Sequence, residues 1–162
     1  MLTPFQTAGP FLDLGLRVGV ASAVDGVAGS IVIRGRLIDG AGAGIPDGVV
    51  ECWHPGLAAM GRSLTDLGGA FTLTTTRPEE VPAPDGSMQA PHLALRVLGR
   101  GILTQYITRL YFPDDPRNAS DPVLNLVPHD RRQTLIAIGD GEGKYRFDII
   151  LQGSGETVFF DV

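Results

Sequence analysis

The sequence contains one cysteine and one lysine in 162 residues. Cys52 has no second thiol for an intrachain disulfide, so nothing indicates an oxidising compartment, and we interpret it as a small buried apolar residue. Thirteen basic residues against eighteen acidic ones, with no basic cluster around Lys144 or elsewhere, argue against a nucleic-acid surface. No run approaches the roughly 20 apolar residues of a membrane span, and the first residues lack the pattern of a signal peptide. We therefore expect a cytoplasmic protein that binds neither nucleic acid nor membrane.

Glycine and proline are abundant, with 22 and 12 residues, and long helical patterns are scarce. This composition is typical of short strands joined by turns. Alternation of apolar and polar residues predicts several strands, and in the segment 144–152 it places Tyr145, Phe147, Ile149 and Leu151 on one face. About eight strands indicate an all-β fold, an antiparallel β-sandwich with irregular loops. The predicted strands are 30–39, 49–53, 70–76, 92–98, 105–112, 133–138, 144–152 and 157–162.

Two long connections are predicted to be irregular because prolines interrupt them. The first covers 77–91, and the second covers 113–128 with a helical turn at 116–120. Residues 1–29 look extended and rich in glycine and alanine, so they are expected to form an extended N-terminal segment that docks on something else or remains free. The sequence thus divides into this segment and a sandwich domain over residues 30–162.

The residues themselves show no catalytic constellation. His54, His92 and His129 have no second histidine, cysteine or carboxylate at ligand spacing on the same strand. His92 has Ala94 as its neighbour on the same strand face, and one imidazole cannot hold a metal that needs three or four donors. A hydrogen-bonded structural role is the more common use of such a histidine. Gly139–Gly143 is glycine-rich, but it lies between predicted strands and is interpreted as a hairpin turn.

Several segments, spread in order over nearly the whole chain, resemble a known family. They include Thr3–Pro10, Val50–Trp53, Gly61–Asp66, Ala90–Leu93, Thr108–Phe112, Pro122–Leu126, Tyr145–Ile149 and the ending Gln152–Asp161. They are similar to the intradiol ring-cleaving dioxygenases, in particular to the alpha chains of the family's two-subunit members. This resemblance implies a β-sandwich core with irregular connections, in agreement with the strand pattern.

The resemblance also implies a non-haem Fe(III) ion held by two tyrosinates and two histidines, since a hard ferric ion favours anionic oxygen donors. The histidine pair matches His92 and Ala94, so the second histidine is missing. Val81 is the counterpart of one tyrosine, and the family's insertion that carries the other, after Trp53, is absent. Gln89 falls near a position where iron-bearing chains have an arginine. No iron is therefore expected in this chain.

The resemblance implies an assembly in which a homologous beta subunit holds the Fe(III) and cleaves the aromatic acid protocatechuate. By motif position, Thr7, Gly9, Pro10 and Arg100 of this chain would line the substrate pocket of that partner. A guanidinium can pair with the substrate carboxylate, and a Gly-Pro turn allows backbone to approach a flat ring. Phe5, Phe11 and Leu12 are expected in the interface.

Two other interpretations remain open. The chain could be a non-enzymatic binding or assembly module derived from the same fold. It could also be a stand-alone dioxygenase with an unusual metal site built on His54, His92 or His129.

Overall fold

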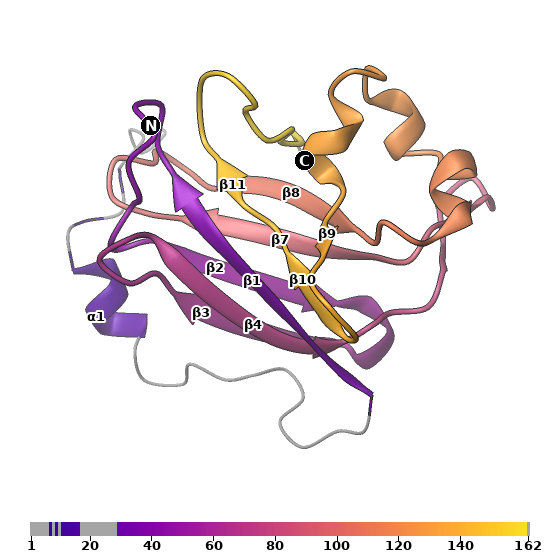
Figure 1. The fold of residues 1–162 in the computed structure, drawn as a ribbon, viewed down its shortest axis with the longest axis horizontal. Coiled ribbons are helices and arrows are strands. Elements are labelled where there is room, and N and C mark those ends of the chain that lie inside the picture. The colour runs from indigo at the N-terminus through magenta and orange to yellow at the C-terminus, as the bar shows by residue number, and fades with distance from the viewer. Residues whose placement is uncertain (1–6, 8, 10, 17–28, 162) are drawn as a thin grey trace, which may run out of the picture.

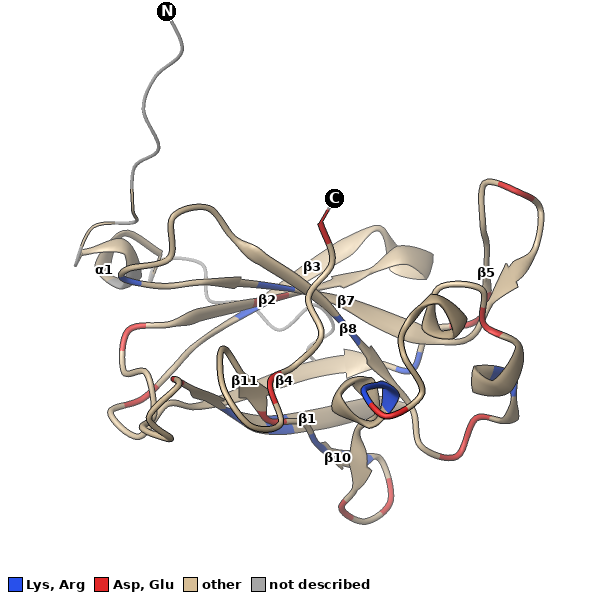
Figure 2. Ribbon diagram, turned by 90° about the horizontal axis from the view of Figure 1, so that it is seen from above, with Lys and Arg blue, Asp and Glu red and all other residues tan. Residues whose placement is uncertain are grey.

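The computed structural model describes residues 7, 9, 11–16 and 29–161. Two β-sheets pack face to face, as the two layers in Figure 2 show. In the first sheet β1 pairs antiparallel with β4 and parallel with β10 and β11, and β9 adds to β10. The second sheet has the order β3-β2-β7-β8, with all pairs antiparallel. The all-β sandwich predicted from the sequence is confirmed, and the two parallel pairings of β1 are its exceptions.

The element bounds agree best with the prediction in the middle of the chain, where β4 and β7 match residue for residue. The strands are β1 (Ser30–Ile38), β2 (Val49–His54), β3 (Ala59–Leu64), β4 (Ala70–Thr76), β5 (Val81–Pro82), β6 (Met88–Gln89), β7 (His92–Leu98), β8 (Tyr106–Tyr111), β9 (Ile138–Gly139), β10 (Lys144–Arg146) and β11 (Ile149–Ile150). The helical elements are α1 (Leu12–Leu16) and the 3-10 turns η1 (Pro55–Leu57), η2 (Pro116–Ser120), η3 (Leu124–Leu126) and η4 (Arg132–Leu135).

Five segments differ from the prediction. The segment 133–138 is not a strand but contains most of η4, where the Thr134 hydroxyl donates to the Arg131 carbonyl at 2.8 Å and stabilises the turn. The described part of the segment 157–162, residues 157–161, forms a single bridge, Phe160 with Ile107, instead of a strand. β3 was not predicted, and the loop 77–91 contains the small hairpin β5–β6. Residues 12–16 form α1, although the rest of the N-terminal segment lies largely outside the described residues.

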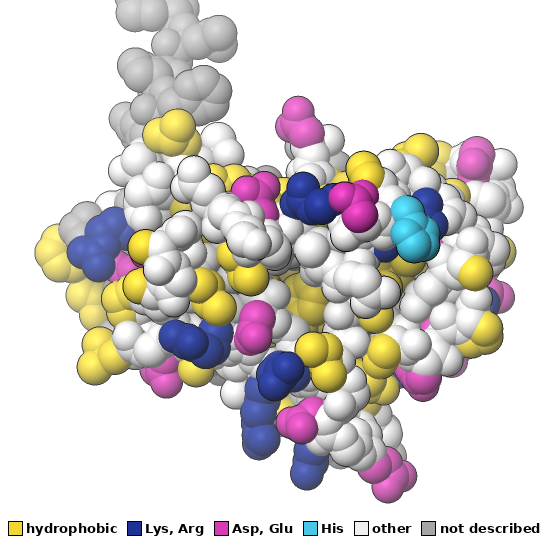
Figure 3. Space-filling model, turned by 45° about the horizontal axis from the view of Figure 1, so that its top comes forward, with side chains coloured by type: hydrophobic (Ala, Val, Ile, Leu, Met, Phe, Trp, Pro, Cys, Tyr) yellow, Lys and Arg dark blue, Asp and Glu magenta, His cyan; other side chains and the backbone are white. Residues whose placement is uncertain are grey.

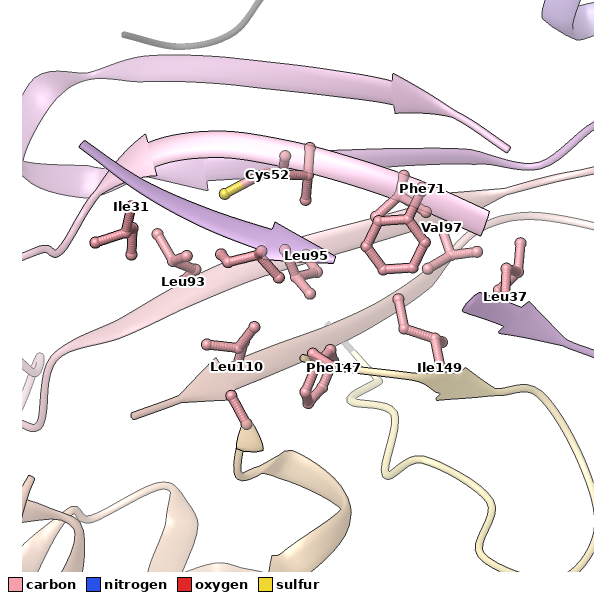
Figure 4. Packing of buried hydrophobic residues seen from close by; sticks show 14 of the residues in the cluster. Ile31, Leu37, Cys52, Phe71, Leu93, Leu95, Val97, Leu110, Phe147 and Ile149 are labelled. Atoms are coloured by element: carbon pink, nitrogen blue, oxygen red, sulfur yellow. The ribbon is translucent and has the colours of Figure 1, made fainter. Parts of the chain in front are cut away.

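The main core lies between the two sheets (Figure 4). Cys52 projects from β2 into it with 1% of its surface exposed, and burial raises the pKa of its thiol to about 12. The predicted face of the segment 144–152 also points inward, with Phe147 and Ile149 buried and Tyr145 and Leu151 packed at the edge. Among the described residues, no helix is long and apolar enough to cross a bilayer.

The irregular turns between β8 and β9 gather at one end of the sandwich (Figure 1). They cover part of the outer face of the second sheet with a smaller apolar cluster that contains Tyr111, Leu124, Val127 and Leu135. This cover has a polar side as well. Buried Asp115 begins η2 by accepting from the Arg117 backbone N–H at 3.0 Å, and its carboxylate pairs with the guanidinium groups of Arg117 and Arg77.

These contacts make the stability of this end of the molecule dependent on pH. Hydrogen bonds from Arg117 and Arg77 hold the pKa of Asp115 well below its usual range, and Arg77 lowers that of Asp114. A carboxyl with a lowered folded pKa stabilises the fold fully above its unfolded pKa of about 3.9, and this contribution is lost as pH falls through the folded value. We expect Asp115→Asn to cost about 1–2 kcal/mol at pH 7.

Thermal unfolding at pH 7 and at pH 3 measures this effect. The gap in Tm between Asp115→Asn and the unmodified chain should shrink in acid. Asp130→Asn, at an exposed position, is the matched control. A gap that is equal at both pH values would show that the ion pairs do not supply the stability.

Candidate functional site

The structure places a buried polar cluster where β7 begins and β8 ends. His92, the first residue of β7, lies directly opposite Tyr111, the last of β8, and their ring centroids are 5.5 Å apart. Both side chains lie on the outer face of the second sheet, away from the main core, because alternation sends Leu93 and Leu110 inward. The irregular turns cover them there, so His92 is 6% exposed and Tyr111 is fully buried.

The protonation of His92 follows from its surroundings. Nδ1 lies 2.8 Å from the Ala90 carbonyl oxygen, which can only accept, so Nδ1 carries the proton. Burial, and then the charge of Arg109, lower the pKa of the imidazole below its ordinary value. The ring is therefore neutral at neutral pH, with a lone pair on Nε2. A histidine held in this tautomer by a backbone carbonyl has the form that binds metals in proteins.

The surroundings of Tyr111 are different from those of a metal-bound tyrosinate. Its hydroxyl donates to Asp121 Oδ1 at 3.0 Å and accepts from Arg109 Nη1 at 3.3 Å. Burial raises the pKa of this phenol above its usual value, so the group stays protonated. The lone pair that a metal would need faces a guanidinium.

Asp121 is the centre of the cluster, with no exposed surface. Its Oδ2 accepts from the Ala90 N–H at 2.8 Å, and its Oδ1 accepts from the N–H groups of Val123 and Leu124 at 3.0 and 2.6 Å. One carboxylate thus joins the entry to β7, the end of β8 and the turn η3. Asp121 was not predicted from the sequence, although Asp-Pro followed by a short helical turn is a typical capping pattern that could have revealed it.

Arg109 occupies the remaining space beside the rings. Its Nη1 donates to Gln89 Oε1 at 2.7 Å, and its guanidinium carbon lies 5.8 Å from the centroid of the Phe160 ring. Gln89 pairs in turn with Val81 across the β5–β6 hairpin. The two residues predicted to replace family site residues, Val81 and Gln89, are therefore brought to this cluster, and Arg109 is a member that sequence reasoning did not find.

These residues do not fit an iron site with two tyrosinates and two histidines. Only His92 has a free donor in the required form, Ala94 stands at the next position on that strand face, and a cationic guanidinium lies beside the one nearby phenol. Throughout the described ranges, no three His, Cys, Asp or Glu side chains come together in a way that could hold a metal ion.

The other two histidines lie in separate places. His54 is buried, its Nδ1 accepts from the Leu57 N–H at 3.1 Å, and its Nε2 lies 3.0 Å from the Thr76 hydroxyl, so it caps η1. His129 is exposed in the loop after η3. The structure therefore does not bring the three histidines together.

Arg100, one of the residues predicted to serve a partner's pocket, lies away from this cluster. Arg100 follows β7, eight residues beyond His92 and so roughly 25 Å away along an extended strand. Its side chain is 58% exposed, and its guanidinium pairs with Asp47 at 2.8 Å. Thr7 and Gly9 are exposed, and Pro10 lies outside the described residues. Their substrate-binding role stays a prediction.

Charges of both signs are interspersed on the face seen in Figure 3, without a broad basic patch. The outer face of the second sheet has an open hollow next to Ala94, lined also by Trp53 and Met60.

No family model matches the sequence. Pairwise comparison finds the protocatechuate 3,4-dioxygenase alpha chain of Pseudomonas putida, which is 36% identical over 192 residues, covering 98% of this chain and 96% of that protein. The beta chain of Burkholderia cepacia is 27% identical over 156 residues, covering 78% of this chain and 66% of the other. The first alignment is longer than the present chain, so the relative contains segments that this chain lacks.

Among solved structures, hydroxyquinol 1,2-dioxygenase from Pseudomonas putida DLL-E4 superposes with a TM-score of 0.64 at 18% identity. The similarity covers 81% of this chain and 59% of that enzyme, so the present chain spans about three fifths of its length. At this identity the comparison shows the fold alone. Together with the extent and identity of the alpha-chain match, it shows that this chain belongs to the protocatechuate 3,4-dioxygenase alpha chains of the intradiol dioxygenase family.

Proposed function

We propose that this chain is the non-iron-binding alpha subunit of a heteromeric protocatechuate 3,4-dioxygenase. The assembly opens 3,4-dihydroxybenzoate between its two hydroxyl-bearing carbons with O2, giving 3-carboxy-cis,cis-muconate. A homologous beta subunit holds the Fe(III), and this chain contributes structure and part of the substrate pocket. In this scheme the assembly works in the cytoplasm, and residues 1–29 form an arm that precedes the sandwich domain of residues 30–162.

The observation that carries the proposal is the arrangement around His92. The chain matches the alpha chains over nearly its full length, yet a guanidinium and a protonated phenol stand where a metal would need anionic donors. Arg109 supplies a fixed positive charge that repels a cation and keeps Tyr111 and Gln89 hydrogen-bonded. The cluster is thus a stable structural unit without a metal.

Iron content of the purified chain, with and without a co-expressed beta subunit, tests this function. The chain alone should contain negligible iron, show no tyrosinate-to-iron absorption and cleave no ring. The co-purified complex should contain about one iron per pair of chains and turn over protocatechuate. Near-stoichiometric iron in the chain alone would contradict the proposal and support a stand-alone enzyme, whereas failure to bind a beta subunit would favour a non-enzymatic module.

Arg100 provides a more local test within the complex. We expect Arg100→Ala to raise the KM for protocatechuate roughly tenfold, because a charge-assisted hydrogen bond to the substrate carboxylate is lost. Iron content should not change, since the beta subunit holds the Fe(III) in this scheme. Arg100→Lys should raise the KM less than Arg100→Ala does. Arg34→Ala, on β1 of the first sheet, is the control. An unchanged KM in Arg100→Ala would remove this residue from the substrate pocket.

A further inference from the structure

A hollow of about 170 Å³ lies at the edge of the first sheet, beside β10 and β11. β9 is only two residues long and pairs with Tyr145 and Arg146 of β10. Further along the same edge, the Thr157 N–H donates to the Ile150 carbonyl at 2.9 Å. Between these two pairings, no strand in the described part of the chain lies beside Asp148, so the hollow stays open there.

Aliphatic side chains form much of the wall of this hollow. Ile136, Ile138 and Ile150 line it, and Ile138 is 55% exposed. Pockets for drug-sized molecules measure about 300–1,000 Å³, so this hollow suits a smaller ligand with an aliphatic group. It shares no residue with the cluster at His92 or with the hollow next to Ala94.

Two residues of opposite charge also line the hollow. Phe147 turns into the core, so its neighbours Arg146 and Asp148 both lie on the outer side of the sheet, and both are exposed. Two residues of extended chain separate their Cα atoms by roughly 6–7 Å. Among the described residues, no ion pair joins these two side chains or links either of them to another charged group.

Both charges are available to a ligand. The guanidinium of Arg146 has no hydrogen-bond partner within the described ranges. Asp148 uses Oδ1 to accept from the Arg36 N–H at 2.9 Å, and its Oδ2 has no partner among the residues that the structure describes. Arg34 lies next to Arg146 in the register of β1 and β10, is exposed, and is likewise without an ion pair in that part of the chain.

This pattern of charges selects the class of ligand. A simple anion would be repelled by Asp148, and a simple cation would be repelled by Arg146 and Arg34. A zwitterion avoids both penalties, and an α-amino acid carries its ammonium and carboxylate groups on one carbon, which matches the short spacing of the two residues. A guanidinium can bind the carboxylate in the bidentate manner, and a carboxylate oxygen can accept from the ammonium group.

We propose that this hollow binds a free aliphatic α-amino acid. The ligand carboxylate lies on Arg146, its ammonium group on Asp148, and its side chain against Ile136 and Ile138, where burial of aliphatic surface stabilises it. The site holds the ligand and performs no chemistry. The proposal stands on the hollow itself and does not depend on the proposed alpha-subunit function.

Saturation-transfer NMR of L-leucine with the purified full-length chain tests this proposal. We expect saturable binding with a Kd on the order of 1 mM, because exposed charge pairs each contribute little. 4-Methylpentanoate lacks the ammonium group and 3-methylbutylamine lacks the carboxylate, so each should bind at least about fivefold more weakly. Glycine, which has no aliphatic side chain, should also bind more weakly than leucine.

Variants locate the binding in the hollow. Arg146→Gln and Asp148→Asn should each weaken leucine binding about fivefold, and the asparagine keeps an oxygen for the Arg36 N–H. Lys144→Gln is the matched control, because Lys144 lies two residues before Arg146 on the same strand and does not line the hollow. Ile138→Ser should weaken the binding of leucine but not that of glycine. Far-ultraviolet circular dichroism and Tm confirm that each variant is folded.

The proposal is overturned if leucine gives no saturable response, or if either analogue with a single charge binds as well as leucine. It is also overturned if folded Arg146→Gln and Asp148→Asn bind leucine as the unmodified chain does, or if Lys144→Gln weakens binding as much as they do. Loss of the leucine response in the complex with the beta subunit would overturn it too, since the hollow is then a subunit contact. None of these outcomes alters the iron content or the KM effect of Arg100, so the two proposals fail separately.

Discussion

Gly35→Ala is expected to lower the free energy of unfolding by about 4 kcal/mol, close to the loss of the fold in a domain of this size. Gly35 lies in the middle of β1, where the backbone of Phe147 crosses between β10 and β11. A methyl group at this position would overlap the Phe147 carbonyl and lie 2.7 Å from Cζ of Phe71. The first of these is backbone and cannot move aside.

The same contact holds the first sheet together. The Phe147 N–H donates to the Arg34 carbonyl at 2.9 Å, and the Arg36 N–H donates to the Asp148 carboxylate at 2.9 Å. A displaced Phe147 would therefore break the hydrogen bonds that tie the link between β10 and β11 to β1. It would also expose a buried ring. The decrease in the free energy of unfolding should therefore exceed the decrease that a single overpacked side chain causes.

Urea denaturation followed by circular dichroism measures the effect. Gly139→Ala is the matched control, because Gly139 lies in β9 of the same sheet and a Cβ there meets no atom within 4 Å. That variant should change stability by less than about 0.5 kcal/mol. Equal denaturation midpoints for the two variants would show that β1 and Phe147 can separate without cost.

Gly35 also explains one limit of the sequence analysis. The alternation in 144–152 correctly predicts which side chains face the core, but it cannot show that the strand is broken at Phe147 and Asp148. A glycine inside the strand pattern of β1 is a known sign of a bulge or a close backbone approach. The partner in that approach lies more than a hundred residues away, so only the fold reveals it.

Other differences between the predicted and the observed elements also arise from long-range contacts. β3 has no clean alternation, and it forms because each of its six residues pairs with β2. The segment 133–138 was predicted as a strand, yet η4 forms there because the Thr134 hydroxyl bonds to Arg131 and accepts from the Val158 N–H at 3.2 Å. Where turns and alternation agreed, as in β4 and β7, the bounds were predicted correctly.

The candidate site was predicted only in part for a related reason. His92, Val81 and Gln89 were found through the resemblance, because their segments match a family pattern. Arg109 and Asp121 were not, since their importance depends on which segments the fold brings together. Asp121 lies in a proline-rich loop that has no periodicity of its own, and its partners come from three separate segments.

Asp121→Ala is the second change with a large expected effect, roughly 4 kcal/mol of unfolding free energy. The buried carboxylate accepts from the Ala90, Val123 and Leu124 N–H groups and from the Tyr111 hydroxyl. Removing it leaves four donors without an acceptor in a site closed to solvent. Each buried unsatisfied group costs about 1–3 kcal/mol, and local opening to water recovers part of the sum.

Asp121→Asn separates the hydrogen bonds from the shape of the side chain. Its single oxygen can serve Tyr111, Val123 and Leu124, while its amide nitrogen faces the Ala90 N–H, so a smaller loss of about 1–2 kcal/mol is expected. Asp130→Ala, at an exposed position, should have little effect. Hydrogen exchange at Ala90 and Leu124 should quicken in Asp121→Ala before global unfolding, because the turn η3 detaches first.

A loss in Asp121→Ala no greater than in Asp130→Ala would contradict the central place of this carboxylate. The expected result links stability to the metal-free site. Asp121 and Arg109 bracket the Tyr111 hydroxyl, so the fold itself depends on the contacts that occupy this hydroxyl on both sides. A substitution that made Tyr111 available to a metal would therefore also weaken the end of the sandwich that holds it.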